Sequence, residues 1–530
     1  MNNKKLRKEK GITVIALVIT IIILLILAGI SIVMLTGDNG ILINTNTSKE
    51  ETKIGEEKEI ASLAQNEVLI SNDGKNITKV GLQNALDTIE GKDKTKVIKD
   101  GKDSYIVTFL ETNRNYKISY GKDVEGPVEI EKIEDIQAGD ITKGNTLDGS
   151  KEKPYQINCI EDLVDFSNRS KKDNFSGKEI IMTRNLDFQS ELSYEDYQIN
   201  KYGDINKDGM TSDLMTELST GTGFEPISKS RQETLIFNGI FDGKKHKLDN
   251  IYITSSLEHV ALFGTTGKTS NIKNLSISGE IIQNGEQGFC SVGSIVGYGN
   301  GKIEFCNNSC TIKKQKNNIY GCGGIAGYYF GTIYSCSNNG KIESAGLAGG
   351  IVGTGSAKTI NCYNKGTVDG QKSVACGING GEYWADSAKI FNCYNVGNIT
   401  SENSTIYNAT SGIYGYMANN IGRLNIINSW NTGKIDNLGK KGKAIIGKIR
   451  IITPNVSNCF YLETSSFETS IALPHSQEYM QSKEFITKLN SYIENNDDTK
   501  GWAKWIQLEG EYPTLDFNTI WDGEKWINID

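Results

Sequence analysis

The sequence is poor in histidine, proline and cysteine, with 3 His, 6 Pro and 10 Cys in 530 residues. No His-Glu-x-x-His motif occurs, which argues against the metallopeptidases that use that zinc site. Ten cysteines in so long a chain are too few for a scaffold held together by disulfides. The 57 Gly are therefore notable. Flexible or polyproline linkers would add Pro or Ser, so glycine here indicates tight corners inside regular structure.

Basic residues are also in the minority, with 57 Lys and Arg against 64 Asp and Glu for a net charge of -7. This balance argues against nucleic-acid binding, because neutralising phosphates needs a basic face. A composition with 37% hydrophobic and 23% charged residues excludes a disordered chain and a multi-span membrane protein. The length exceeds the roughly 250 to 300 residues of a single core, so we expect several domains or one elongated repeat domain.

The first long feature is an apolar run of 24 residues, 12–35, without a charge and preceded by five basic residues. As a helix it would be about 36 Å long, enough to cross a hydrocarbon core of about 30 Å. The basic flank predicts an N-terminus inside the cell and the remainder outside, at the cell surface. A plain signal anchor fits these features. A cleaved secretory signal fits less well, because the run is long and no small-x-small cleavage site follows it.

Residues 10–17 read KGITVIAL, which resembles the type IV prepilin signature. The resemblance implies that a prepilin peptidase cuts between Gly11 and Ile12 and methylates the new N-terminus. Ala16 departs from the pattern, because Glu is usual at the fifth mature position. This departure bears on assembly into a filament more than on cleavage.

The next segment is rich in Glu, Lys and Ala, and its apolar spacing over 46–71 predicts that the helix continues into water. A short helix is predicted at 82–89. Residues 105–110 and 116–120 flank a polar turn and predict a β-hairpin. A long helix packed on a small antiparallel sheet is similar to the pilin arrangement. We therefore predict a pilin-like α+β domain at 75–126, followed by a linker at 127–139.

Six segments then repeat a glycine-rich pattern, each followed by a second element that opens on Cys or Ser. The second elements begin 30, 26, 31, 36 and 30 residues apart, which is solenoid spacing. Strand-sized apolar triplets with Gly at the corners predict stacked β-coils. The six segments are GSIVG at 293–297, GGIAG at 323–327, GGIVG at 349–353, CGING at 376–380, SGIYG at 411–415 and KAIIG at 443–447.

The stretch 349–368, with GGIVG followed by NCYNKGTV, resembles the GLUG repeat of bacterial surface proteins. The resemblance covers roughly residues 140–515 and implies a right-handed parallel β-helix. The fold class that we expect is thus mainly β: a solenoid preceded by a long hydrophobic helix and a pilin-like domain. The expected parts are a leader at 1–11, a transmembrane and stalk helix at 12–72, the α+β domain at 75–126, a linker at 127–139, the β-helix at 140–470 and a C-terminal cap at 471–530.

Stacking of the repeats would align five cysteines and one serine in a column inside the solenoid. We interpret this column as a ladder of small buried side chains. Stacked parallel side chains have the wrong approach for a disulfide, and the chain has no Cys-x-x-Cys pair that would favour zinc. The aligned residues are Cys306, Cys336, Cys362, Cys393, Ser429 and Cys459.

Residues 204–209, DINKDG, open like a calcium loop, with oxygen ligands at alternate positions before a glycine. The candidate Ca²⁺ ligands are Asp204, Asn206, Asp208 and Asp213. The twelfth position of the loop is Met215, where an EF-hand has Glu. An acidic surface turn is therefore the alternative interpretation, and no other cofactor is expected.

Aromatic residues follow the glycine corners, and a row of rings at one edge could stack on sugar faces. The alternative is an aromatic ladder that seals the coil. The candidate glycan-binding residues are Tyr328, Tyr329, Tyr383, Trp384 and Tyr416. The C-terminal tryptophans, together with the amphipathic stretch 480–493, predict a cap over the open last turn, which a solenoid needs.

Catalysis has little support in the sequence, because the regular coils carry mostly Asn, Ser, Thr and Lys, where a β-helix lyase or glycosidase would set carboxylates. Our leading hypothesis is a non-enzymatic, membrane-anchored surface protein for adhesion or for binding the cell wall or a glycan. Its expected partners are the membrane, a prepilin peptidase and a surface glycan or protein, and nucleic acid is not expected. The alternatives are a carbohydrate-active β-helix enzyme and a minor pilin or pseudopilin that joins a filament.

Overall fold

The computed structural model divides the chain into two compact units, Met1–Ile133 and Glu134–Asp530. Each unit is described by itself. The structure describes residues 41–71, 77, 79–91, 94–99, 104–128, 140–191, 223–229, 231–232, 234–285, 289–315, 321–382, 387–402, 409–417, 423–437, 442–449, 453–464, 467–468, 471–508 and 510–529.

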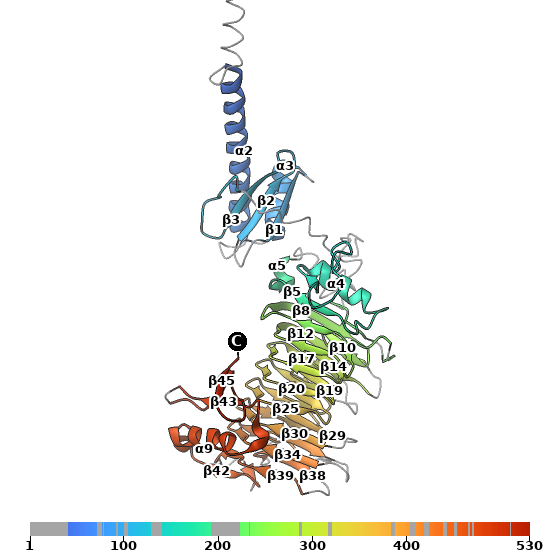
Figure 1. The fold of residues 1–530 in the computed structure, drawn as a ribbon, viewed down its shortest axis with the longest axis vertical. Coiled ribbons are helices and arrows are strands. Elements are labelled where there is room, and N and C mark those ends of the chain that lie inside the picture. Colours follow the sequence, from blue (N-terminus) through green and yellow to red (C-terminus); the bar gives the residue numbers. More distant parts are fainter. Residues whose placement is uncertain are drawn as a thin grey trace, which may run out of the picture. The chain divides into compact units, whose positions relative to one another are not determined.

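The first unit packs two helices on a small antiparallel sheet (Figure 1). Its sheet has the strand order β1-β2-β3. Helix α2 and the β2–β3 hairpin lie where the sequence places a helix and a hairpin, β1 was not predicted from the sequence, and the pilin-like character of this unit stays a prediction. The elements are α2 (Ile41–Ser71), α3 (Lys79–Glu90), β1 (Thr95–Lys99), β2 (Ser104–Phe109) and β3 (Arg114–Ser119).

A buried carboxylate ties α2 to the hairpin. Glu57, which is 2% exposed, accepts hydrogen bonds from Thr112 Oγ1 at 2.6 Å and Tyr116 Oη at 2.9 Å. Arg114 Nη1 lies 3.0 Å from Glu57 Oε2, the oxygen that also accepts from Tyr116, while Thr112 donates to Oε1. One turn further on, Ala61 and residues after it pack into the core of this unit. The stalk helix is thus fixed to the sheet by a charged contact as well as by apolar packing.

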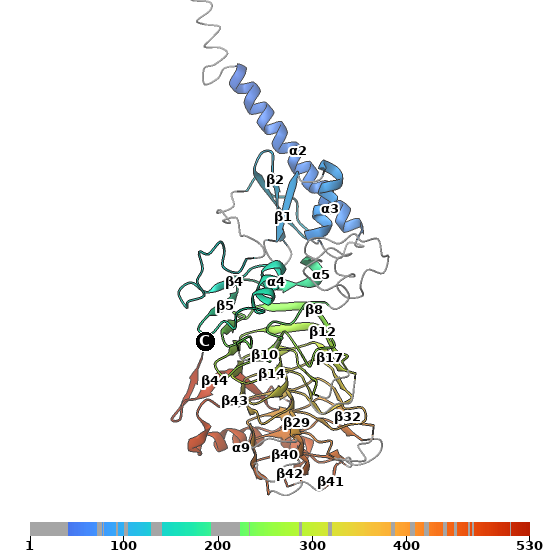
Figure 2. The same ribbon diagram turned by 90° about the vertical axis from the view of Figure 1, so that its right-hand side faces the viewer.

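The second unit is a parallel β-solenoid, which confirms the expected fold, while its right-handedness stays a prediction. Equivalent strands of successive coils pair in parallel (Figure 2). One face, here called sheet B, has ten strands. They are β4 (Tyr155–Ile157), β5 (Glu179–Met182), β7 (Ile240–Asp242), β11 (Asn271–Lys273), β15 (Lys302–Glu304), β20 (Thr332–Tyr334), β25 (Lys358–Ile360), β30 (Ser387–Phe391), β34 (Arg423–Ile427) and β39 (Asn455–Ser457).

A second face, sheet D, has seven strands and carries the second half of each glycine-rich segment. It meets a short face, sheet E, at the glycine corners. Sheet D contains β10 (Phe263–Thr266), β14 (Val296–Gly299), β19 (Ala326–Tyr329), β24 (Val352–Thr354), β29 (Asn379–Glu382), β33 (Tyr414–Met417) and β38 (Ile446–Ile449). Sheet E contains β9 (His259–Val260), β13 (Ser291–Val292), β18 (Cys322–Gly323), β23 (Ala348–Gly349) and β28 (Ala375–Cys376), and β37 (Gly442–Lys443) pairs with β41 (Phe467–Glu468).

The remaining face, sheet C, consists of two columns that the long strand β12 joins. Gly279 has φ +136° at the bend of β12, where a Cβ atom would lie 2.0 Å from the carbonyl oxygen of Ile251, so only glycine fits. One column contains β16 (Asn307–Asn308), β21 (Ser337–Asn338), β26 (Tyr363–Asn364), β31 (Tyr394–Asn395), β35 (Trp430–Asn431), β40 (Phe460–Leu462) and β42 (Leu473–His475). The other contains β6 (Leu186–Asp187), β8 (Lys247–Ser255), β12 (Ser276–Gln283), β17 (Thr311–Lys314), β22 (Ile342–Ser344), β27 (Val368–Asp369), β32 (Ile399–Thr400) and β36 (Ile435–Asp436).

Helix α4 (Ile160–Arg169) closes the first turn of the solenoid. The Phe166 ring stacks on Phe241 of β7 at 6.0 Å and meets the edge of Phe263 of β10 at 6.1 Å. Through these aromatic contacts α4 joins the apolar core of the solenoid and covers the N-terminal end of that core. A short helix, α5 (Phe188–Glu191), follows β6.

The C-terminal residues fold into a module of helices and a three-stranded antiparallel sheet. The sequence predicted that this segment caps the open last turn. Instead it lies along the flank of the solenoid, beside β20 to β39 (Figure 1). Contacts run from Tyr334, whose Oη donates to the Gly501 carbonyl at 2.5 Å, to Phe460, which meets Phe485 edge-on. The elements are α8 (Gln477–Met480), α9 (Lys483–Glu494), a 3₁₀ turn (Asp497–Thr499), β43 (Ala503–Ile506), β44 (Thr514–Trp521) and β45 (Trp526–Asn528).

The module sits on this flank because the outward side chains there are apolar. Tyr363, Tyr394 and Trp430 occupy one outward register position on successive coils and stack at ring distances of 4.9 and 4.7 Å. Residues of α9 and the Trp502 and Trp505 rings bury this ladder. Burying several large rings stabilises the flank by roughly 1.5 to 3 kcal/mol for each side chain.

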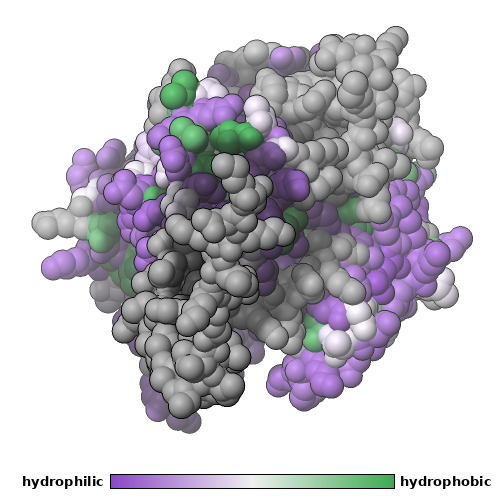
Figure 3. Space-filling model, turned by 90° about the horizontal axis from the view of Figure 1, so that it is seen from above, coloured by the Kyte–Doolittle hydropathy of each residue, from purple (hydrophilic) through white to green (hydrophobic). Residues whose placement is uncertain are grey.

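The surface that can be seen from above is largely polar where it is described (Figure 3). Figure 3 shows one face on which hydrophilic residues predominate and hydrophobic patches are small and separate. Such isolated apolar groups are usual on soluble surfaces. The large hydrophobic side chains that are exposed include Leu63, Ile70, Leu110, Phe289, Ile471, Leu473 and Leu508.

Candidate functional site

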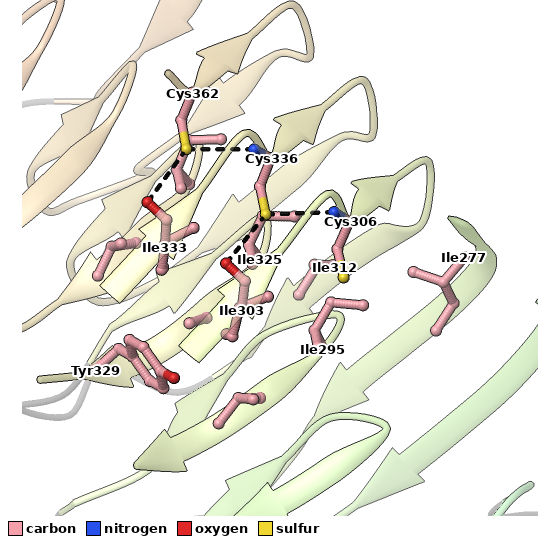
Figure 4. Close-up of a cluster of buried hydrophobic side chains, with 14 of the residues drawn as sticks. Ile277, Ile295, Ile303, Cys306, Ile312, Ile325, Tyr329, Ile333, Cys336 and Cys362 are labelled. Carbon is pink, nitrogen blue, oxygen red and sulfur yellow. Dashed lines mark hydrogen bonds between the residues drawn. The ribbon is translucent and has the colours of Figure 1, made fainter. Parts of the chain in front are cut away.

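The cysteine column lies inside the solenoid, as expected from the repeat spacing (Figure 4). All ten cysteines are free thiols. The Cys336 Sγ accepts a hydrogen bond from the Cys306 backbone at 3.4 Å, and Cys362 Sγ accepts from Cys336 at the same distance. Ser429 Oγ accepts the equivalent hydrogen bond from the Cys393 backbone N–H at 3.1 Å. Burial raises the pKa of the Cys306, Cys336 and Cys362 thiols well above the ordinary value of 9.0. The column is therefore a packing device without a reactive thiolate.

A second interior column consists of asparagines, and the sequence interpretation missed it. The side-chain amide of each Asn except the last donates to the Oδ1 of the Asn on the next coil at 2.6 to 2.8 Å. Four of them also donate to the carbonyl of a glycine two residues on. The signal was present in the repeat, because this Asn follows the Cys or Ser position by two residues. The members are Asn308, Asn338, Asn364, Asn395 and Asn431.

Several predicted site residues lie outside the described residues. These are the processing positions Gly11, Ile12 and Ala16, the calcium candidates Asp204, Asn206, Asp208 and Asp213, and the aromatic pair Tyr383 and Trp384. Within the described ranges, no group of three or more His, Cys, Asp or Glu side chains could hold a metal ion. No helix among those residues is long and apolar enough to cross a membrane, and the run 12–35 is not among them.

The three remaining glycan candidates are packed inside the protein. Tyr328, Tyr329 and Tyr416 are 4%, 0% and 2% exposed. Tyr329 joins the main core, and Tyr416 packs in a small cluster with Leu347. A buried ring has no face to offer a sugar, so the structure favours the alternative of a sealing ladder for these three residues.

Beside Tyr328, the corner between sheets D and E holds a pair that resembles a Ser-His hydrolytic arrangement. His259 Nδ1 lies 2.8 Å from Ser291 Oγ, and both side chains are buried. Arg231 Nε donates to His259 Nε2 at 2.7 Å, and the guanidinium lies 5.1 Å from the centre of the Tyr298 ring. Glu258 Oε2 is 3.2 Å from Arg231 Nε.

The direction of these hydrogen bonds argues against a nucleophilic serine. Because Nε2 accepts from Arg231, the imidazole proton is on Nδ1, which donates to Ser291 Oγ. Ser291 in turn donates to the Gly297 carbonyl at 2.8 Å. A general base must accept the serine proton, whereas His259 donates to this serine. Burial, followed by the charge of Arg231, lowers the pKa of His259 to about 3, so the relay holds a neutral imidazole.

The solvent-exposed candidate is the outer face of sheet B. Parallel pairing places Lys302, Thr332, Lys358, Lys389, Asn425 and Asn455 at one outward register position. Arg423 pairs with Ser387, two residues before Lys389 on the same face. Lys302, Lys358, Lys389, Arg423 and Asn455 are exposed. At about 4.8 Å per coil, the six residues extend over about 24 Å.

The cations of this face differ in their partners. Lys302 Nζ lies 4.0 Å from Glu304. In contrast, the side-chain nitrogens of Lys358, Lys389 and Arg423 form no ion pair or hydrogen bond within the described part of the chain. The outward positions of β25, β30 and β34 carry no carboxylate. Two cations about 4 Å apart repel by about 1 kcal/mol in water, so an anion that bridges them would be favoured.

We call these three side chains the basic column. Its inner edge borders the C-terminal module, because Phe391 follows Lys389 by two residues on the same face and stacks on Trp502 at 5.5 Å. The composition of the whole chain gave no sign of this local group of cations. The column combines residues 358, 389 and 423, which lie outside the repeated motifs, so only the strand register brings them together.

Comparison with known proteins leaves the family open. No protein-family model matches the chain. A segment of 173 residues, 32% of this chain, is 24% identical to halomucin of Haloquadratum walsbyi (strain DSM 16790 / HBSQ001), and the match spans 2% of that protein's length. A crystal structure of a candidate immunoglobulin A1 protease from Bacteroides ovatus aligns with 70% of this chain and 94% of its own at 16% identity and a TM-score of 0.42. At that score the likeness assigns neither a fold nor an activity to this chain.

Proposed function

We propose that this protein is a non-enzymatic binding protein of the cell surface. In this proposal the apolar run 12–35 anchors it in the membrane and the solenoid stands outside, where it binds a polymer of the wall or of another surface. The apolar length and the basic flank support the anchor.

The observation that carries the binding role is the outer face of sheet B. Its outward register position holds six polar residues on six coils. On the four coils from β25 to β39, these residues are lysines and asparagines whose side chains are exposed or half-exposed. An extended, flat polar face suits an extended ligand. By contrast, the interior is filled by the Ile, Cys and Asn columns.

The location can be tested on intact cells that produce the chain. We expect an external protease to remove the solenoid while a cytoplasmic marker stays intact, and we expect the chain to fractionate with membranes. Protection of the solenoid until the cells are lysed would overturn the proposal. Mass spectrometry of the mature N-terminus then distinguishes the two anchors, because prepilin processing predicts methylated Ile12 and a plain anchor predicts intact Met1.

A minor pilin or pseudopilin is the second candidate, and the first unit favours it. Helix α2 packs on an antiparallel sheet through Ala61, Ala64 and Val68, and Glu57 fixes it to the hairpin. Cross-linking on cells is the test. A series of cross-linked oligomers of this chain, or cross-links to a major pilin, would support its incorporation into a filament. A chain that remains monomeric after cross-linking would contradict this candidate function.

A further inference from the structure

We propose that the basic column binds a linear anionic polysaccharide, laid along the solenoid axis across β25, β30 and β34. This inference rests on the proposed binding function and names the ligand class and the residues. The sugars' carboxylates would pair with Lys358, Lys389 and Arg423, which lack a partner among the described residues.

The geometry favours a linear chain. Lys358 and Lys389 are register partners on adjacent strands, so their backbones are about 4.8 Å apart. Arg423 lies one strand further on and two residues earlier along its strand, about 6.6 Å from the register position of Lys389. A chain along the solenoid axis can therefore meet Lys358 and Lys389 in turn, and the long side chain of Arg423 would reach it across this sideways offset.

The neighbours of the cations favour a sugar polymer over other polyanions. Thr332 precedes the column, and Asn425 and Asn455 follow it, with Asn455 Nδ2 donating to Asn425 Oδ1 at 3.1 Å. Hydroxyl and amide groups at these positions can exchange hydrogen bonds with sugar hydroxyls. Nucleic acid fits less well, because the column supplies three cations on a chain with net charge -7, and binding to a phosphate backbone gains most of its affinity from many cations.

The edge of the C-terminal module supplies a wall for this site. Phe391 is half-buried and stacks on Trp502, and Tyr492 also stacks on Trp502, at 6.4 Å. The apolar wall stands next to Lys389, so a bound chain would have one dry side. Partial exclusion of water strengthens a charge pair relative to a fully exposed one.

The test uses the full chain in detergent micelles and immobilised polygalacturonate, with dextran as the neutral polymer. We expect salt-sensitive binding to polygalacturonate and none to dextran. The triple variant K358Q/K389Q/R423Q should bind on the order of 10- to 100-fold more weakly, since three exposed charge contacts are lost. The matched control K365Q/K372Q/K434Q removes the same net charge from exposed lysines beside sheet C. It should keep its affinity.

Three results would overturn the inference: undiminished binding by the first variant, an equal loss in both variants, or binding of polyphosphate or single-stranded DNA as tight as that of polygalacturonate. Hydrogen exchange over β25 to β34 verifies that the variants are folded. Glycan binding that survives in the first variant overturns this site and leaves the proposed surface function standing. That function fails separately, if the solenoid is protected on intact cells.

Discussion

Trp505 Nε1 donates a hydrogen bond of 2.6 Å to the Oδ1 of Asn392, which joins residues 113 positions apart in the chain. Asn392 belongs to an outer corner where successive asparagines have φ near +55° and donate to one another, as Asn392 does to Asn361 at 2.9 Å. It also donates to the Ala503 carbonyl at 2.9 Å. One side chain thus holds the coil corners and the C-terminal module together.

Replacing Asn392 by Ala should release the module from the flank. Several buried donors and acceptors lose their partner at once, at about 1 to 3 kcal/mol each, and Ala is strained at positive φ. We expect hydrogen exchange over 483–505 to accelerate in the full chain. Asn392→Gly separates the two causes, because glycine accepts the backbone angle and lacks the amide. Unchanged exchange in both variants would show that aromatic packing alone holds the module.

The buried thiols predict that the solenoid loses stability in alkali. Burial raises the pKa of Cys322, Cys376 and Cys459 to about 12. A raised folded pKa gives stability that is complete below the unfolded value of 9.0 and is lost as pH rises towards 12. Each such thiol should then cost about 1.4 kcal/mol for each pH unit above 9.

Lys314 opposes this trend, because burial lowers the pKa of its amine to about 8. It is one group against several thiols, so the net slope should remain negative. Urea midpoints at pH 8, 9, 10 and 11 measure it. Replacing Cys322 by Ala should make the alkaline slope shallower, and identical slopes with and without this thiol would contradict the account.

In acid, His259 should make the folded protein less stable as the pH falls, whereas the thiols make it less stable as the pH rises. Its folded pKa of about 3 lies below the ordinary 6.5, so its stabilisation is complete above pH 6.5 and declines as pH falls towards 3. His259→Gln keeps polar atoms at the site and cannot titrate. The stability difference between this variant and the native chain should shrink by about 1.4 kcal/mol for each pH unit from 6.5 downwards. A constant difference over that range would mean that the imidazole is solvated.

In the first unit, Glu57→Ala should loosen the hairpin from α2. The change leaves the partly buried Arg114 without this carboxylate, and because breaking a fully buried pair typically costs about 3 to 5 kcal/mol, we expect a loss towards the lower end of that range. Amides of β2 and β3 should exchange faster. The matched change at exposed Glu59 should alter exchange little, and equal effects of the two variants would contradict a specific role for Glu57.

The parts predicted well from the sequence are those that repeat in it. The parallel coils and the cysteine ladder follow from motifs recurring at solenoid spacing, and the β2–β3 hairpin follows from alternation around a polar turn. The asparagine ladder was visible in the same motifs, but a polar residue beside a strand gives no sign of facing inward until the coil is closed. The position of the C-terminal module on the flank depends on which outward residues are apolar. The basic column depends on the register between strands that are separated by unequal numbers of residues in the sequence. Both need the three-dimensional pairing.

The central claim is binding without catalysis, and the length of a bound polysaccharide tests it most directly. The full chain would be incubated with polygalacturonate, and the polymer's size distribution would be followed by size-exclusion chromatography with light scattering. The account predicts that the polymer is retained by the protein and keeps its length. Reproducible shortening that disappears on mutating an outward carboxylate of the solenoid would contradict it.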